Sequence, residues 1–283
     1  MRRGVLAARG ESPAAFDRRC IPPRGVAPWS HKPTILPRRV LPGGRLTGLG
    51  ATRDFHHGLL MTGWIGGLVV CGLGALAGVE QETGTVTGVV TVDTVPEKMM
   101  VTVDTDQAIC GDEIEDRSTV VSPSGGVANA VVLVTGLEWS MDPPAPSLSN
   151  QGCFFVPRVQ VAKTRSQLEI LSVDDTLHST HAYDDRQRTM FNVALPFPGL
   201  NIKRPLRRPG VMRVECDSHG WMRGWVYVTN DVATVTSEDG RFEIDDVPPG
   251  TYELAVWHER YEGTAQTVTV TAGGTAEASF SLE

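Results

Sequence analysis

The chain has 283 residues, of which 41% are hydrophobic, and it carries a formal net charge of -7. That length has room for two domains, and the hydrophobic content is ordinary for a soluble protein. The charge is unevenly spread, because residues 1–57 hold 11 Lys and Arg against 3 Asp and Glu, whereas residues 78–283 hold 15 against 30. This asymmetry indicates that the basic front (residues 1–57) and the acidic body (residues 78–283) do not fold as one unit.

The basic front, residues 1–57, contains seven prolines and no apolar periodicity. We expect one of two explanations for this extension. Either it is disordered, or translation starts downstream of it. Residues 58–79 are free of charge, and the small Ala75 and Ala77 suit signal-peptidase cleavage before Gly78. The same stretch is long enough to remain as a membrane anchor, and a buried core helix is a third interpretation. The first two place the acidic body in the periplasm or outside the cell, which disfavours a nucleic-acid role for the front.

From residue 84 onward the sequence has the pattern of short strands and turns, with little that favours a helix. β-Branched and apolar runs bounded by Gly and Pro predict strands at residues 85–92, 128–134, 154–161, 167–173, 211–216 and 225–228. Strands this short and this regularly spaced are typical of β-sandwiches. We therefore predict an all-β protein with its first strands within 84–140 and a sandwich at 141–231.

A second, smaller β module is predicted at residues 232–283. Residues 238–241, Glu-Asp-Gly-Arg, predict a hairpin, because Asp-Gly readily adopts the positive φ of a primed turn. Residues 248–250, Pro-Pro-Gly, predict a further turn, and Gly273-Gly274 separates the last two expected strands.

Residues 216–222, Cys-Asp-Ser-His-Gly-Trp-Met, carry the strongest functional signal. Cys216, His219 and Met222 offer a thiolate, an imidazole and a thioether at intervals of three residues. Two His, one Cys and a weak axial Met are the ligands that select copper in electron-transfer sites, and His178 supplies the second His. Zinc competes for Cys and His ligands but does not recruit Met. The sequence therefore predicts one copper ion per chain on these four residues.

Three cysteines follow the predicted export segment, namely Cys110, Cys153 and Cys216. An unpaired thiol is normally a liability in an oxidising compartment. If copper occupies Cys216, the other two cysteines can pair and no free thiol remains. A Cys110–Cys153 disulfide is therefore a hypothesis that rests on this arithmetic alone.

The stretch from about 150 to 230 resembles the cupredoxin family, the small blue (type 1) copper proteins. Cys216-x-x-His219-x-x-Met222 has the tight spacing of amicyanin-like members, and His178 stands where the family supplies its first His. The stretch also looks like exported plastocyanin-like proteins labelled methylamine-utilisation-like. The family usually has Asn after the first His, whereas Ser179 here hydrogen-bonds with fewer donors. The resemblance implies a Greek-key β-sandwich around the copper site.

The tail from Thr236 to Leu282 resembles the carboxypeptidase regulatory-like, or transthyretin-like, module. Its phrases Thr-x-x-Asp-Gly-x-Phe and Pro-Pro-Gly-x-Tyr-x-Leu are distinctive together. Such modules normally begin with strands like those expected at 85–92 and 128–134. Either these strands complete the C-terminal module, with the copper domain inserted between them and the tail, or 128–134 is the first cupredoxin strand.

The four predicted ligands leave no position for a substrate, which indicates an electron carrier rather than an enzyme. The acidic body favours a basic redox partner, and membrane contact is expected only if residues 58–79 stay uncleaved. Two alternatives remain open. One is a protein for copper storage or delivery, and the other is an extracellular binding module, such as one for glycans, with a vestigial copper loop.

Four other residues near these motifs have a less specific interpretation. His181 and His178 should face opposite sides of one strand, so we expect His181 at the surface or outside the ligand set. His258 is expected to be a surface or packing residue. Trp221 and Phe197 form either an apolar rim around the copper or ordinary core.

Overall fold

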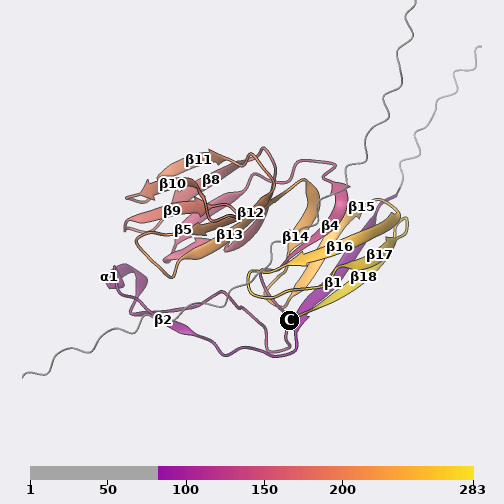
Figure 1. Cartoon of the computed structure of the whole chain (residues 1–283), viewed down its shortest axis with the longest axis horizontal. Coiled ribbons are helices and arrows are strands. Elements are labelled where there is room, and N and C mark those ends of the chain that lie inside the picture. Colours follow the sequence, from indigo (N-terminus) through magenta and orange to yellow (C-terminus); the bar gives the residue numbers. More distant parts are fainter. Residues whose placement is uncertain (1–81) are drawn as a thin grey trace, which may run out of the picture. The chain divides into compact units, whose positions relative to one another are not determined.

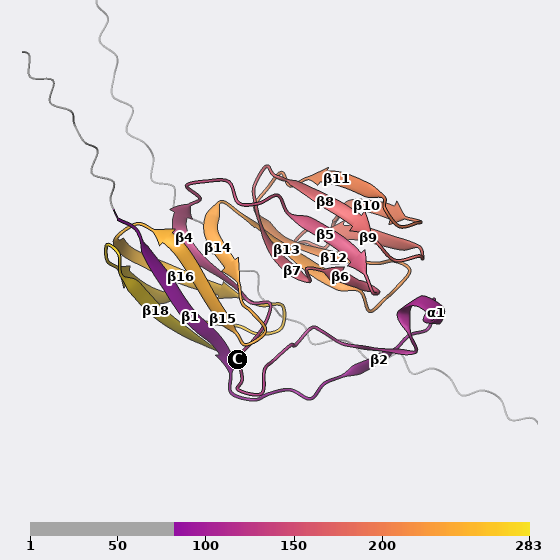
Figure 2. The same cartoon turned by 180° about the vertical axis from the view of Figure 1, so that it is seen from behind.

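The computed structural model describes residues 82–283 (Figures 1 and 2). The predicted basic extension at 1–57 and the predicted signal or anchor at 58–79 lie outside the described residues. Within 82–283 nearly all regular structure is β, and the one helix, α1, is the four-residue turn Gln107–Cys110. This part of the chain contains no helix of the length and apolarity that a membrane span requires. The predicted all-β class is confirmed.

The first sandwich consists of a five-stranded and a four-stranded sheet. The five-stranded sheet has the order β10 (Thr189–Leu195), β9 (His178–Tyr183), β12 (Gly210–Glu215), β13 (Arg223–Thr229) and β7 (Val159–Lys163). The four-stranded sheet has the order β11 (Asn201–Pro205), β8 (Gln167–Ser172), β5 (Ser147–Gln151) and β6 (Phe154–Val156). Side chains that alternate along the strands, such as Ile170 and Val214, fill the core between the sheets.

The second sandwich combines strands from both ends of the described chain. One sheet has the order β15 (Arg241–Val247), β1 (Gly84–Val92) and β18 (Thr275–Leu282). The other has the order β14 (Asp231–Val235), β4 (Val131–Glu138), β16 (Gly250–Trp257) and β17 (Gln266–Val270). Of the two alternatives for the early strands, the structure therefore has the one in which they complete the C-terminal module. The first sandwich is inserted between β4 and β14.

Two local predictions are wrong, and each error concerns which sheet a strand joins. The single strand expected at 154–161 is two strands, β6 and β7, which lie in different sheets with Pro157 between them. Proline has no N–H for a strand ladder, so the chain can cross over there. Residues 238–241 do form a turn, with Gly240 at φ 79°. They do not form a hairpin, because β14 pairs with β4 and β15 pairs with β1.

Within the described residues the two sandwiches share apolar side chains. Val131 and Ala233 of the second sandwich form a buried cluster with Val159 of the first. The rings of Trp225 and Trp257 meet edge to face across this cluster, with centroids 5.5 Å apart. A close ion pair joins Arg158 to Glu259, with side chains that are 11% and 3% exposed.

The segment that joins β1 to β4, residues 93–130, leaves the second sandwich and returns to it. It contains β2 (Met100–Thr102), α1 and β3 (Glu113–Glu115), and both views show β2 and α1 outside the two sandwiches (Figures 1 and 2). Val103 and Ile114 anchor it in the core of the first sandwich. A disulfide joins Cys110 to Cys153, as the count of cysteines predicted. We call residues 93–130 the connecting segment.

Candidate metal centre

Adjacent strands of the first sandwich bring three of the four predicted ligands together. His178 is the first residue of β9, and Cys216 directly follows β12, which pairs with β9. The Cys216 Sγ lies 3.9 Å from the His178 Nδ1 and 3.5 Å from the His219 Nδ1. Both imidazoles are 0% exposed and Cys216 is 4% exposed. The ligand atoms of these three residues all lie within 4.8 Å of one another.

The two imidazoles point the same nitrogen at the thiol, because a carboxylate holds the other nitrogen of each. The His178 Nε2 lies 3.0 Å from the Asp174 Oδ2, and the His219 Nε2 lies 3.0 Å from the Asp106 Oδ2. An ionised carboxylate only accepts hydrogen bonds, so the hydrogen of each neutral ring belongs on Nε2. The lone pairs of both Nδ1 atoms then face Cys216. Carboxylates support metal-binding histidines in this way.

The carboxylate behind His178 is itself held firmly. Asp174 accepts hydrogen bonds from the backbone N–H groups of Gly152 and Cys153, at 2.7 and 2.9 Å. Burial lowers the pKa of His178 and the nearby His219 lowers it further, whereas the hydrogen bond to Asp174 raises it. The balance favours a neutral imidazole, the form that binds metal.

The carboxylate behind His219 comes from a distant part of the chain. Asp106 precedes α1 with φ 53° and ψ 33°, and its Oδ2 also accepts a hydrogen bond from the Thr176 hydroxyl at 2.8 Å. That hydrogen bond is the main reason that the pKa of the Asp106 carboxyl lies below its usual value. Sequence reasoning missed Asp106, because 113 residues separate it from His219. No local spacing signals the contact.

Ser179, which stands where cupredoxins usually have Asn, connects the two segments that carry the ligands. Its backbone N–H donates to the Cys216 Sγ at 3.3 Å. Its hydroxyl oxygen accepts a hydrogen bond from the Asp217 N–H at 2.7 Å. Cys216 is the free cysteine among the described residues.

Met222 closes the loop that begins at Cys216. Its N–H donates to the His219 carbonyl at 3.0 Å, and its carbonyl accepts from the Cys216 N–H at 3.3 Å. The residue is 1% exposed and belongs to the same core cluster as Cys216. The fourth predicted ligand therefore lies in the same closed loop as two of the others.

The remaining candidates lie outside the ligand cluster. His181 is hydrogen-bonded to Asp217 at 2.9 Å and to the Thr189 hydroxyl at 2.8 Å, and its ring stacks on Tyr183. His258 is buried in the second sandwich as a packing residue. It stacks on Tyr261, with ring centroids 5.1 Å apart.

The two aromatic residues that the sequence left undecided have different surroundings. Trp221 packs beside His219, with ring centroids 5.1 Å apart, and donates its indole N–H to the Cys153 carbonyl at 3.2 Å. Phe197 is 57% exposed, so it is not core.

The donor atoms fit a transition metal. With metal–nitrogen bonds of about 2.0 Å and metal–sulfur bonds of about 2.3 Å, a nitrogen and a sulfur in a trigonal plane lie about 3.7 Å apart. The two sulfur–nitrogen distances, 3.5 and 3.9 Å, bracket this value. A second cluster of Cys153, Asp174 and His178 also brings ligand atoms together. Its cysteine is oxidised in the disulfide and offers no thiolate.

The comparison with family models agrees with one of the two resemblances found in the sequence. The family model of the carboxypeptidase regulatory-like domain matches residues 226–283. A search of curated proteins finds no match to this chain.

Among solved structures, a purple cupredoxin from Nitrosopumilus maritimus is 18% identical, with 30% of this chain and 99% of that chain covered and a TM-score of 0.27. A reduced amicyanin mutant is 12% identical over 35% of this chain and 98% of that one, with a TM-score of 0.28. A copper-containing nitrite reductase from Thermus scotoductus is 17% identical over 32% of this chain, with a TM-score of 0.27. The chain spans only 24% of that reductase. The described residues thus combine a sandwich that holds the cluster of His178, Cys216 and His219 with a second sandwich whose C-terminal part matches the carboxypeptidase regulatory-like model.

Proposed function

We propose that this protein is an exported mononuclear type 1 copper protein that carries electrons between redox partners. One observation carries the proposal. Two buried imidazoles present Nδ1 to a buried free thiol while carboxylates hold both Nε2 atoms. His178, Cys216, His219 and Met222 would hold the ion, and a donor set of two His, one Cys and one Met favours copper.

The proposed role is electron transfer rather than catalysis, because the chain surrounds the site with its own groups. His178, His219 and Met222 are each no more than 1% exposed. Bound copper would supply a one-electron couple between Cu(II) and Cu(I). The strands β9 and β12 and the closed loop 216–222 would hold the donors in one geometry for both states, which favours rapid exchange of electrons.

Export is part of the proposal because of the chemistry of the cysteines. A Cys110–Cys153 disulfide joins the connecting segment to the first sandwich, and disulfides persist in oxidising compartments. The predicted signal or anchor at 58–79 is consistent with the same location. The excess of acidic residues over 78–283 favours a basic redox partner.

The test is to add Cu(II) to the purified protein and to its Cys216→Ser variant and to record visible absorption spectra. We expect an intense thiolate-to-copper band in the natural protein and its complete loss in the variant, whose far-UV circular dichroism should be unchanged. Voltammetry should then show a reversible one-electron wave. An intense band without that wave would favour copper storage or delivery. A colourless protein, or a weak band that persists in Cys216→Ser, would contradict the copper site and favour a binding module.

A further inference from the structure

The connecting segment does more than link two strands of the second sandwich. It crosses to the first sandwich, where Val103 and Ile114 enter the core and Cys110 is bonded to Cys153. Asp106 lies between the first of these apolar anchors and the disulfide. Three fixed points on a short stretch therefore hold one carboxylate beside His219.

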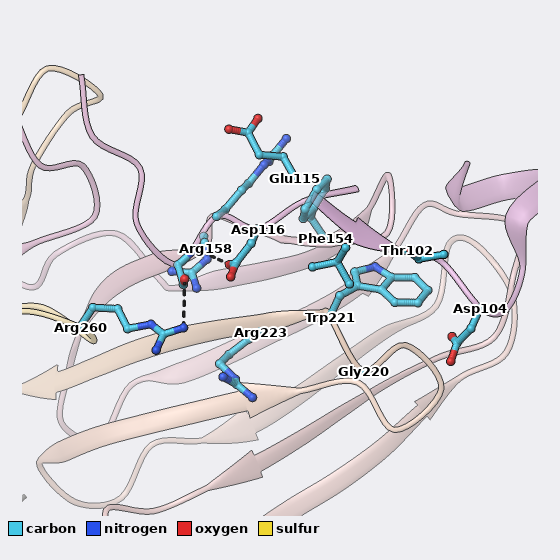
Figure 3. A pocket seen from close by; sticks show the side chains of 13 residues that line it. Thr102, Asp104, Glu115, Asp116, Phe154, Arg158, Gly220, Trp221, Arg223 and Arg260 are labelled. Carbon is cyan, nitrogen blue, oxygen red and sulfur yellow. Dashed lines mark hydrogen bonds between the residues drawn. The ribbon is translucent and has the colours of Figure 1, made fainter. Parts of the chain in front are cut away.

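The connecting segment also lines a cavity of about 330 Å³ beside the proposed copper loop. Thr102 and Asp104 of the segment and Trp221 of the loop lie around it (Figure 3). The indole of Trp221 also packs against His219, with ring centroids 5.1 Å apart. His219 is thus enclosed by its own loop and by a segment that belongs to neither sheet of the first sandwich.

We propose that Asp106 is a positioning residue for His219, delivered by the connecting segment, and that it favours Cu(II) over Cu(I) at the site. The proposal rests on the function proposed above. The carboxylate accepts the Nε2 hydrogen, which fixes the tautomer with Nδ1 available to the metal. The hydroxyl of Thr176 donates to the same oxygen and keeps the carboxylate in place.

The direction of the effect follows from charge. A carboxylate bonded to the outer nitrogen makes the imidazole a stronger donor. Its negative charge stabilises the more positive oxidised ion more than the reduced ion. Asp106 therefore lowers the reduction potential and raises the affinity for Cu(II) more than the affinity for Cu(I).

The experiment compares Asp106→Asn with Asp104→Asn in the full chain. Asp104 is an exposed acid two residues away that contacts neither site imidazole, so its variant removes the same charge without the hydrogen bond. Asp106 is itself about 40% exposed, so its replacement should leave the fold intact. Affinities for Cu(II) and Cu(I) are measured by competition with chelators, and midpoint potentials by spectroelectrochemistry.

We expect Asp106→Asn to keep the intense visible band but to lose roughly 10-fold to 100-fold in Cu(II) affinity, with a smaller loss for Cu(I). The potential should rise by about 59 mV for each tenfold difference between the two losses. In nitrogen-15 NMR of the Cu(I) protein, the His219 Nε2 hydrogen should be visible in the natural protein and exchange faster in the variant.

The possible outcomes separate this inference from the proposed function. If the natural protein lacks a Cys216-dependent band, the copper function itself is wrong. If the band is present but Asp106→Asn matches Asp104→Asn in both affinities and in the potential, Asp106 has no positioning role. A fall in potential for Asp106→Asn would contradict the direction of the charge effect.

Discussion

Buried histidines lie in both sandwiches, but the groups around them differ. His178 and His219 of the first sandwich have Nε2 on a carboxylate and Nδ1 toward Cys216. His258 of the second sandwich is 6% exposed, and its Nδ1 accepts a hydrogen bond from the backbone N–H of Arg260 at 3.2 Å. Burial lowers the pKa of His258 to about 4, and the positive charges of Arg158 and Arg260 contribute to the shift.

Burial alone therefore does not distinguish a metal ligand from a packing residue. A carboxylate fixes the hydrogen on one ring nitrogen and leaves the other free for a metal. The Nδ1 of His258 instead accepts a backbone N–H, and burial, together with the positive charges of Arg158 and Arg260, keeps the ring neutral. The hydrogen-bond partners of the two ring nitrogens thus distinguish His178 and His219 of the first sandwich from the packed His258 of the second. Three substitutions test this contrast.

The largest effect is expected for Asp174→Ala. The change removes the partner of the His178 Nε2 and leaves the N–H groups of Gly152 and Cys153 without an acceptor. We expect a loss of about 2–4 kcal/mol in the free energy of unfolding of the metal-free protein. Copper affinity should fall at least 10-fold. Urea unfolding and chelator competition measure the two effects.

Asp175→Ala is the matched control for this substitution. Asp175 is the exposed neighbour of Asp174, so its replacement by Ala removes the same charge from the same loop. Equal unfolding free energies and copper affinities for the two variants would show that Asp174 does not support the site.

A second test uses the pH dependence of stability, which His258 should influence through its pKa. The unfolded side chain binds a proton below about pH 6.5, whereas the folded one does so only below about pH 4. Between these values the unfolded state holds more protons, so stability falls as the pH is lowered. The full difference is about 3 kcal/mol. Urea unfolding of metal-free protein at pH 4 to 7 measures it.

His258→Gln should remove this contribution and flatten the profile relative to the natural protein. Carboxyl groups titrate over part of the same range in both proteins, so the difference between the two profiles isolates His258. Parallel profiles would mean that the buried ring is not held neutral.

The smallest effect is expected for Ser179→Ala. The substitution leaves the Asp217 N–H without its acceptor and loosens the link between the loops that carry His178 and Cys216. We expect a loss of about 1 kcal/mol in unfolding free energy and a broadened visible band. Ser218→Ala, in the loop that carries Cys216, is the control. If the two variants have the same stability and spectrum, the hydroxyl of Ser179 does not join the loops.

Much of the first sandwich was predictable because its signals are local. Alternating apolar residues marked β8, β12 and β13, and the spacing of Cys216, His219 and Met222 marked one loop. The sheet to which each strand belongs was less predictable, because pairing is decided by partners far along the chain. The turn at residues 238–241 was predicted because its signal is local. The hairpin predicted around it was wrong, because the flanking strands pair with distant strands.

The sequence by itself determined the all-β class, the candidate donors Cys216 and His219 and the Cys110–Cys153 pairing, because residue type, short-range spacing and the number of cysteines define them. Only the tertiary structure decided that β1 and β4 complete the C-terminal module and that Asp106 reaches His219. These contacts join residues that lie about one hundred positions or more apart in the chain. Their formation depends on the packing of the two sandwiches and of the segment between them, which no local pattern encodes.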